Sequence, residues 1–146
     1  MSLALALLSL LQTLAAPLSP PDDALPRCGQ DAREPNDARS RAKSTRDRST
    51  AAVTCATDAD WFYVDAVRGE RVEARFEHAN DAHLAVEVFA PRRRKPLARS
   101  RPFSRGSRVG FAAPKSGRYR IRVLGEGKDD TPYTLRVIRR RAPGGG

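Results

Sequence analysis

Oxygen-bearing side chains are concentrated in two short stretches whose residue types suit metal binding. The residues concerned are Asp31, Glu34, Asn36, Asp37, Asp58 and Asp60. Calcium takes six to eight oxygen ligands from carboxylates, amides and backbone carbonyls. The same residue types also accept hydrogen bonds from backbone N–H groups and thereby fix turns. The sequence therefore predicts either a calcium site or a set of polar turn caps here.

Two cysteines, Cys28 and Cys55, each stand a few residues before one of these acidic stretches. An even number of cysteines in an exported chain predicts a disulfide. A zinc site built on them would need further ligands at regular spacing, and His78 and His83 do not supply it. We expect a Cys28–Cys55 bridge, which would bring the two acidic stretches together.

Catalytic patterns are missing from the sequence. It contains no Gly-x-Ser-x-Gly elbow and no glycine-rich phosphate loop. His78 and His83 flank a short polar segment where they could pinch a metal with Asp81, but solvated loop histidines are the commoner arrangement. Each cysteine has an expected partner in the other. We expect no enzymatic activity.

The strongest charge feature is the basic run Arg92, Arg93, Arg94 and Lys95, which lies between two prolines. The whole chain carries a formal net charge of +10, which favours polyanionic partners. The run is therefore a candidate polyanion-binding loop, and the alternative is a solvated loop tip. No aromatic residue interleaves these basic residues, so we expect no nucleic-acid partner.

Composition divides the chain into unequal parts. Residues 1–15 form an uncharged, Leu- and Ala-rich run, shorter than the ~20 residues that span a bilayer, and typical of a secretory signal peptide. Residues 16–27 form a Pro-rich spacer, residues 33–50 a long polar surface segment, and residues 139–146 a basic, Gly-rich disordered tail. We expect a secreted or periplasmic protein without a membrane span after processing.

Between these parts, short segments alternate apolar and polar residues with a period of two and end at turn residues. About eight strands are predicted, at 51–56, 60–66, 71–77, 83–89, 96–101, 108–113, 118–124 and 132–138. One polar face per strand indicates antiparallel sheets packed on one side. Because no helical pattern intervenes, the prediction is an all-β, antiparallel, jelly-roll-like β-sandwich.

The large aromatic residues are expected to build the core of this sandwich. Trp61 and Phe62 open one strand and should supply its heaviest apolar area. Tyr119 and Tyr133 are expected as buried or half-buried packing residues. Gly69 stands where a turn favours a positive φ.

Three sequence pieces, taken in order, resemble one known family. The first is Glu-Pro-Asn-Asp at 34–37, and the second is Asp-Ala-Asp-Trp-Phe at 58–62, followed by Arg-Gly-Glu at 68–70. The third is Ser-Gly-Arg-Tyr at 116–119, which precedes Pro-Tyr-Thr-Leu at 132–135. Their order and spacing resemble the bacterial pre-peptidase C-terminal domain.

The resemblance covers residues 28–138 and implies a jelly-roll-like sandwich, usually appended to exported enzymes and itself without catalytic activity. Some relatives bind calcium in these regions, which by resemblance singles out Glu34, Asn36 and Asp37, with Asp60. Calcium-binding relatives carry an acid two residues before the motif's glutamate, where this chain has Ala32. The full candidate ligand set combines both arguments and is Glu34, Asn36, Asp37, Asp58 and Asp60.

The expected function is a free-standing, secreted, non-catalytic binding or accessory module whose partner is an extracellular protein or a polysaccharide. The first alternative is an accessory module for a separately encoded exported peptidase. The second is a polyanion or cell-surface binder that acts through the arginine-rich loops.

Overall fold

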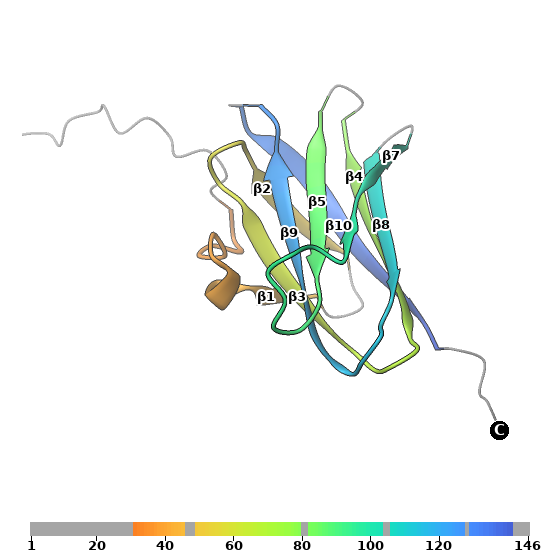
Figure 1. Cartoon of the computed structure of the whole chain (residues 1–146). Helices are drawn as coiled ribbons and strands as arrows, with labels where there is room; N and C mark the ends of the chain where they lie inside the picture. The colour runs from red at the N-terminus through yellow and green to blue at the C-terminus, as the bar shows by residue number, and fades with distance from the viewer. Residues whose placement is uncertain (1–30, 46–48, 80–81, 104–105, 128, 142–146) are drawn as a thin grey trace, which may run out of the picture.

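Two five-stranded sheets make up the folded part of this protein (Figure 1). The computed structural model describes residues 31–45, 49–79, 82–103, 106–127 and 129–141. Regular structure in these residues is almost entirely β-strand. The predicted all-β sandwich is thereby confirmed.

Sheet A is antiparallel except at one edge, where the two-residue strand β1 runs parallel to β3. Its strands, in spatial order, are β1 (Lys43–Ser44), β3 (Asp60–Ala66), β9 (Gly117–Gly125), β5 (Leu84–Phe89) and β6 (Ala98–Arg99).

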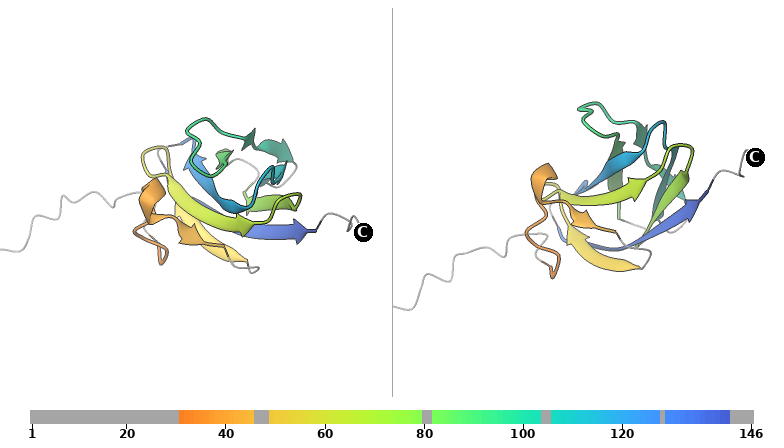
Figure 2. Two further views of the ribbon diagram at one scale, coloured as in Figure 1. Left: turned by 60° about the horizontal axis from the view of Figure 1, so that its bottom comes forward. Right: turned by 90° about the horizontal axis from the view of Figure 1, so that it is seen from below.

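Sheet B is antiparallel throughout, and Figure 2 shows it as a second layer against sheet A. Its strands, in spatial order, are β2 (Thr50–Thr54), β10 (Thr131–Arg140), β4 (Arg71–His78), β8 (Gly106–Ala112) and β7 (Arg101–Phe103).

The core lies between the two sheets and is built from the apolar half of each alternating strand. Phe62, Tyr119 and Ile121 of sheet A and Phe76 and Leu135 of sheet B are among its fully buried side chains. Burying an apolar side chain of this size contributes roughly 1.5–3 kcal/mol. The period-two patterns that predicted the strands thus also predict which of their residues face inward.

Trp61 departs from the expectation that it joins Phe62 in the core. Neighbouring residues of a strand face opposite sides of the sheet, and Phe62 takes the inward position. Trp61 is therefore half-buried on the outer face of sheet A, with its ring centroid 5.5 Å from that of Phe89. The Arg122 guanidinium lies over the indole at 5.9 Å.

The segment between residues 96 and 103 contains two short strands where a single one was predicted. β6 belongs to sheet A and β7 to sheet B, so the chain crosses between the sheets at Ser100. The backbone N–H of Ser100 donates to Val86 O at 2.8 Å, and the Val86 N–H donates to the Ser100 hydroxyl at 3.1 Å. These bonds fix the crossing point against β5.

Both ends of the described chain are more ordered than their polar sequences indicate. Within the predicted surface segment 33–50, Arg39–Arg41 form a short 3-10 turn, η1, and β1 pairs with β3. At the other end, β10 continues through Arg139 and Arg140, which were expected in the tail. The Arg139 Nε donates to the buried Glu70 carboxylate at 2.8 Å.

The remaining predictions about the ends fall outside the described residues. These are the signal peptide, the Pro-rich spacer and residues 142–146 of the tail.

Candidate functional site

The structure gathers three of the predicted ligand residues at one end of the sandwich. Glu34, Asp58 and Asp60 each place one carboxylate oxygen within 4.8 Å of the others. Glu34 lies in the segment before η1, Asp58 lies in the turn between β2 and β3, and Asp60 is the first residue of β3. We call this group the carboxylate cluster.

Asn36 is fully buried beside the carboxylate cluster and joins the N-terminal segment to β3. Its backbone N–H donates to Glu34 Oε2 at 3.0 Å, and its carbonyl oxygen accepts from the Trp61 N–H at 2.8 Å. With the amide nitrogen turned toward the cluster, it donates to Asp60 Oδ1 and Glu34 Oε1, both at 3.2 Å. Rotating the amide by half a turn would present its oxygen to the same carboxylates.

Asp60 makes its main polar contact across the core with Tyr133. The Tyr133 hydroxyl, on β10 of sheet B, donates to Asp60 Oδ2 at 2.5 Å. Burial raises the pKa of the Asp60 carboxyl to about 7, against the lowering effect of the tyrosine bond and with further raising by Asp31 and Asp58. Burial and the adjacent Asp60 likewise raise the pKa of Tyr133.

Asp58 is the member of the cluster whose bonding is incomplete. Its Oδ2 is buried and has no hydrogen-bond partner among the described residues. Burial, followed by the charges of Glu34 and Asp37, raises the pKa of the Asp58 carboxyl. A cation would satisfy this oxygen and offset the repulsion among the carboxylates, so the donor set fits calcium chemistry.

Asp37, the fifth predicted ligand, lies outside the carboxylate cluster. Its side chain is exposed and forms an ion pair with Arg41, four residues on, at 3.4 Å. Asp31 instead caps turns and a strand edge, because its carboxylate accepts from the N–H groups of Arg33 at 2.5 Å and Val53 at 2.6 Å. Turn capping, the alternative open at the sequence level, is therefore present beside the candidate metal site.

Cys55 is completely buried at the turn that leads to Asp58. The described residues contain no free cysteine. Gly125 packs so closely against it that a Cβ there would lie 2.8 Å from Cys55 Cα. Cys28 lies outside the described residues, so the bridge between the two cysteines stays a prediction.

The predicted polyanion loop is exposed at all four basic residues, Arg92 to Lys95, and is held in place by backbone contacts. Arg93 N–H donates to Ala90 O at 3.1 Å, and Arg92 has a φ of 61°. The Arg39 guanidinium donates to Arg93 O at 2.7 Å and lies 5.3 Å from the centroid of the Phe89 ring. The loop is thus tied to η1, while its side chains face solvent.

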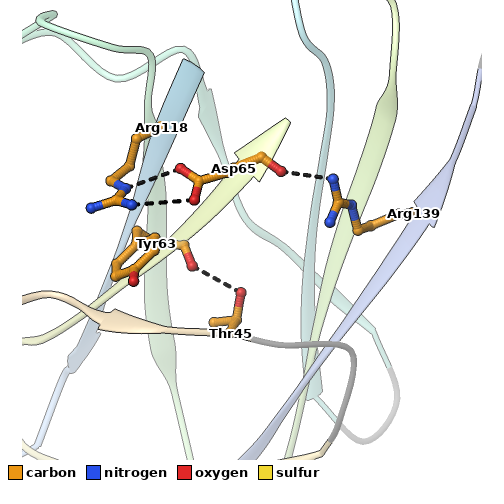
Figure 3. Close-up of polar contacts among 5 residues, drawn as sticks. All are labelled: Thr45, Tyr63, Asp65, Arg118 and Arg139. Carbon is orange, nitrogen blue, oxygen red and sulfur yellow. Dashed lines mark hydrogen bonds and ion pairs between the residues drawn. The ribbon is translucent and has the colours of Figure 1, made fainter. Parts of the chain in front are cut away.

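On the outer face of sheet A, arginines are paired with carboxylates (Figure 3). Arg118 donates to both oxygens of Asp65, at 3.0 and 3.2 Å, and lies 3.8 Å from the centroid of the Tyr63 ring. Two further bonds in the same region go to backbone carbonyl oxygens of β3. Arg139 donates to Asp65 O at 2.7 Å, and the Thr45 hydroxyl donates to Tyr63 O at 3.0 Å.

The same pairing recurs one strand further across sheet A. Glu87, on β5, accepts ion pairs from Arg122 at 2.7 Å and from Arg99 at 3.3 Å. Arg118 and Arg122 of β9 are therefore matched by acids on the neighbouring strands, whereas the buried Nε of Arg120 between them has no hydrogen-bond partner among the described residues.

The two histidines differ in their surroundings. His78 Nδ1 lies 2.8 Å from Ala79 O, and its Nε2 lies 3.4 Å from the Ser107 hydroxyl. His83 is exposed just before β5. Neither belongs to the group of potential metal ligands in the described part of the chain.

The described residues include no helix long and apolar enough to cross a membrane.

Comparisons with known proteins relate this chain to others by fold. No family model and no curated protein matches it. Among solved structures, the pre-peptidase C-terminal domain of a collagenase from Bacillus anthracis superposes with a TM-score of 0.57 at 13% identity, covering 66% of this chain and 96% of that one. The fold of this chain thus resembles that of a pre-peptidase C-terminal domain.

A second solved structure with this architecture is PliG of Aeromonas hydrophila, a periplasmic inhibitor of g-type lysozyme. It superposes with a TM-score of 0.52 at 19% identity, covering 64% of this chain and 85% of PliG. Both neighbours are small β-domains, one a domain of a collagenase and the other an inhibitor of a lysozyme.

Proposed function

We propose that this protein is an exported, non-catalytic binding module with a macromolecular partner. The observation that carries the proposal is the distribution of its chemistry: apolar side chains fill the interior, and charged side chains cover the broad outer faces of both sheets. Small-molecule sites are mostly concave and apolar, whereas specific protein interfaces bury large and flatter areas. A charged sheet face is suited to the second kind of partner.

Export is part of this proposal. It is supported by the leader-like composition of residues 1–15 and by the fold shared with a periplasmic inhibitor and with a domain of a collagenase. The expected location is the periplasm or the exterior of the cell. Membership of the pre-peptidase C-terminal family is proposed on the three sequence pieces together with the likeness of fold.

We also propose that calcium stabilises the module. The ligands would be the carboxylates of Glu34, Asp58 and Asp60 and, after rotation of its amide, the side-chain oxygen of Asn36. The unsatisfied Asp58 Oδ2 supports this assignment. Bound calcium would neutralise the clustered carboxylates, and these four residues would then hold the N-terminal segment against β3.

The partner class is proposed to be an extracellular protein or a polysaccharide. PliG is named as an inhibitor of a lysozyme, which supports a protein partner for this fold. The collagenase domain supports the alternative of an accessory module for a separately encoded exported peptidase. Co-purification with an exported peptidase encoded beside this chain would favour that alternative.

The test is a binding screen of the purified chain against extracellular proteins and polysaccharides, combined with analysis of each ligand for chemical change. We expect at least one ligand to bind and to be recovered intact. Two double variants test the two outer faces separately. They are Arg118→Gln with Arg122→Gln on sheet A, and Arg108→Gln with Arg136→Gln on sheet B. Retention of all binding by both variants would contradict a sheet-face site, and turnover of the ligand would contradict the non-catalytic role.

A further inference from the structure

The strand register of sheet B places four arginines in a single row. Arg101 lies opposite Arg108, Arg108 lies opposite Arg75, and Arg75 lies opposite Arg136. Residues directly opposite each other in antiparallel strands point to the same face. All four side chains are exposed. We call them the arginine row.

The arginine row crosses β7, β8, β4 and β10, which lie side by side in Figure 1. Neighbouring strands are about 4.8 Å apart, so four strands give a row of roughly 14 Å. The flanking residues Val109, Ala74 and Val137 are buried, as period-two alternation requires. The row therefore lies on the solvent-facing side of the sheet.

Acids compensate little of this charge. Like charges directly opposite one another destabilise a sheet. Of the four arginines, Arg75 pairs with Glu73, and the other three form no ion pair with a carboxylate of the described residues. On sheet A, Arg99, Arg118 and Arg122 have carboxylate partners, and Arg120 forms no ion pair with a carboxylate of the described residues.

The basic surface continues beyond the row along β4 and β10. Arg71 lies opposite Arg140 at the far end of these strands. Between this pair and the arginine row is a hollow of about 420 Å³, lined in part by Glu73, Gly110 and Ile138. Gly110 has no side chain to fill the hollow, so the face offers a depression that is lined on one side by Arg71 and Arg140.

We propose that the outer face of sheet B binds a linear anionic polysaccharide, whose repeated sulfate or carboxylate groups lie along the arginine row. The guanidinium fork binds such oxyanions in a bidentate manner, and a row of forks suits a ligand with many anions better than one with a single anion. This inference rests on the proposed binding function and names its ligand class and site.

A polysaccharide fits this face better than a single-stranded nucleic acid does. Non-specific binding of single strands combines a basic groove with aromatic side chains on which bases stack. On β4 and β10 the residues that flank the arginine row are Glu73, Glu77, Thr134 and Ile138, and none of these offers a ring for stacking. The register places one aromatic residue, Phe103 of the edge strand β7, two positions after Arg101. The site also differs from the loop of Arg92 to Lys95, which lies after β5 of sheet A.

The experiment measures the affinity of the purified full chain for a heparin-derived oligosaccharide over a range of salt concentrations. Arg108→Gln with Arg136→Gln removes two charges from the row, and Arg92→Gln with Arg93→Gln removes two from the loop as the matched control. The row variant should bind at least about tenfold more weakly, as expected for two lost charge-assisted contacts. Its plot of log affinity against log salt concentration should also be shallower. The control should change by less than about threefold.

Thermal unfolding separates loss of the site from loss of the fold. Because the row contains opposed like charges, its neutralisation should leave the melting temperature unchanged or raise it. Equal weakening by the row and loop variants would overturn the proposal, as would a row variant that binds like the wild type.

Two further arms separate this inference from the proposed function. If the wild type binds no heparin oligosaccharide yet binds a purified protein in the screen, the polysaccharide site is wrong and the binding module stands. If single-stranded DNA of equal charge binds more tightly through the same row, the assignment of the ligand class is wrong.

Discussion

The hydroxyl of Tyr133 donates a hydrogen bond to the carboxylate of Asp60 at 2.5 Å, and this contact joins the two sheets through the interior. Both residues are buried, and they lie 73 positions apart in the chain. The bond places a tyrosine of sheet B directly against the carboxylate cluster. The cluster is thus coupled to the packing of the whole sandwich.

Removal of this hydroxyl should destabilise the protein. Tyr133→Phe leaves a buried carboxyl without its donor, which costs about 2 kcal/mol in the free energy of unfolding. Tyr119→Phe is the matched control, because the Tyr119 hydroxyl donates at 2.6 Å to the neutral carbonyl oxygen of Lys115 and should be worth about 1 kcal/mol. Urea denaturation of both variants provides the measurement. A cost for Tyr133→Phe no larger than that of the control would contradict a special role for the Asp60 contact.

The raised pKa of Asp60 predicts a pH dependence of stability in the presence of a chelator. The Asp60 carboxyl has a pKa of about 7 in the folded state and an ordinary value of 3.8. Between pH 3.8 and pH 7, the folded protein therefore holds a proton on Asp60 that the unfolded chain has released. Rising pH in this range therefore favours unfolding, and the contribution of Asp60 to stability falls by at most roughly 4 kcal/mol. It should change little above pH 7 or below pH 4.

Asp60→Asn isolates this contribution because an amide does not titrate. As the pH rises from 4 to 7, the unfolding free energy of the wild type should fall relative to that of the variant. A difference that stays constant across this range would show that Asp60 titrates normally.

Calcium should raise the melting temperature of the protein, with magnesium having a much smaller effect. Binding to the folded state alone stabilises by about 2.7 kcal/mol at a hundredfold excess over Kd. Glu34→Gln should abolish the shift, whereas Asp37→Asn should preserve it, because Asp37 faces Arg41 outside the cluster. Scanning calorimetry with calcium and then with chelator is the measurement. An unchanged midpoint would leave hydrogen bonding within the cluster as the explanation of its acids.

Cys28 and Cys55 should be bridged in protein recovered after export. The bridge would close a loop of about 27 residues, worth roughly 3.5 kcal/mol in the chain-entropy model. Cys55→Ser should lower the melting temperature and expose the segment of residues 34–45 to proteolysis. Thiol labelling under denaturing, non-reducing conditions is the direct check, and two free thiols per chain would refute the bridge.

The strands and their inward faces were readable from sequence because each alternates locally. Phe76 and Leu135 are buried as their patterns predict. The prediction that Trp61 joins the core was wrong, because two adjacent aromatic residues do not by themselves show which one faces inward. The apolar residues at alternate positions after Phe62 identify Phe62 as the inward-facing one. The same alternation marked Tyr133 as a packing residue but could not indicate its polar partner.

Contacts between distant segments could not be predicted in this way. The meeting of Glu34 with Asp58 and Asp60 was anticipated through an assumed disulfide and through the family resemblance. The position of Asp37 outside the cluster accompanies a local ion pair with Arg41, which the sequence did not predict. The arginine row depends on register between strands, since a shift by one residue would move an arginine to the other face. Its members look like ordinary solvent-facing residues in the sequence.

The binding face is tested most directly by mapping backbone amide shifts of the labelled protein during titration with a sulfated oligosaccharide. The account predicts that the largest shifts fall on β4, β7, β8 and β10, around Arg75 and Arg108, while amides near Asp60 change little. Shifts confined to the loop of Arg92 to Lys95, or spread evenly over both sheets, would contradict a ligand site on the outer face of sheet B.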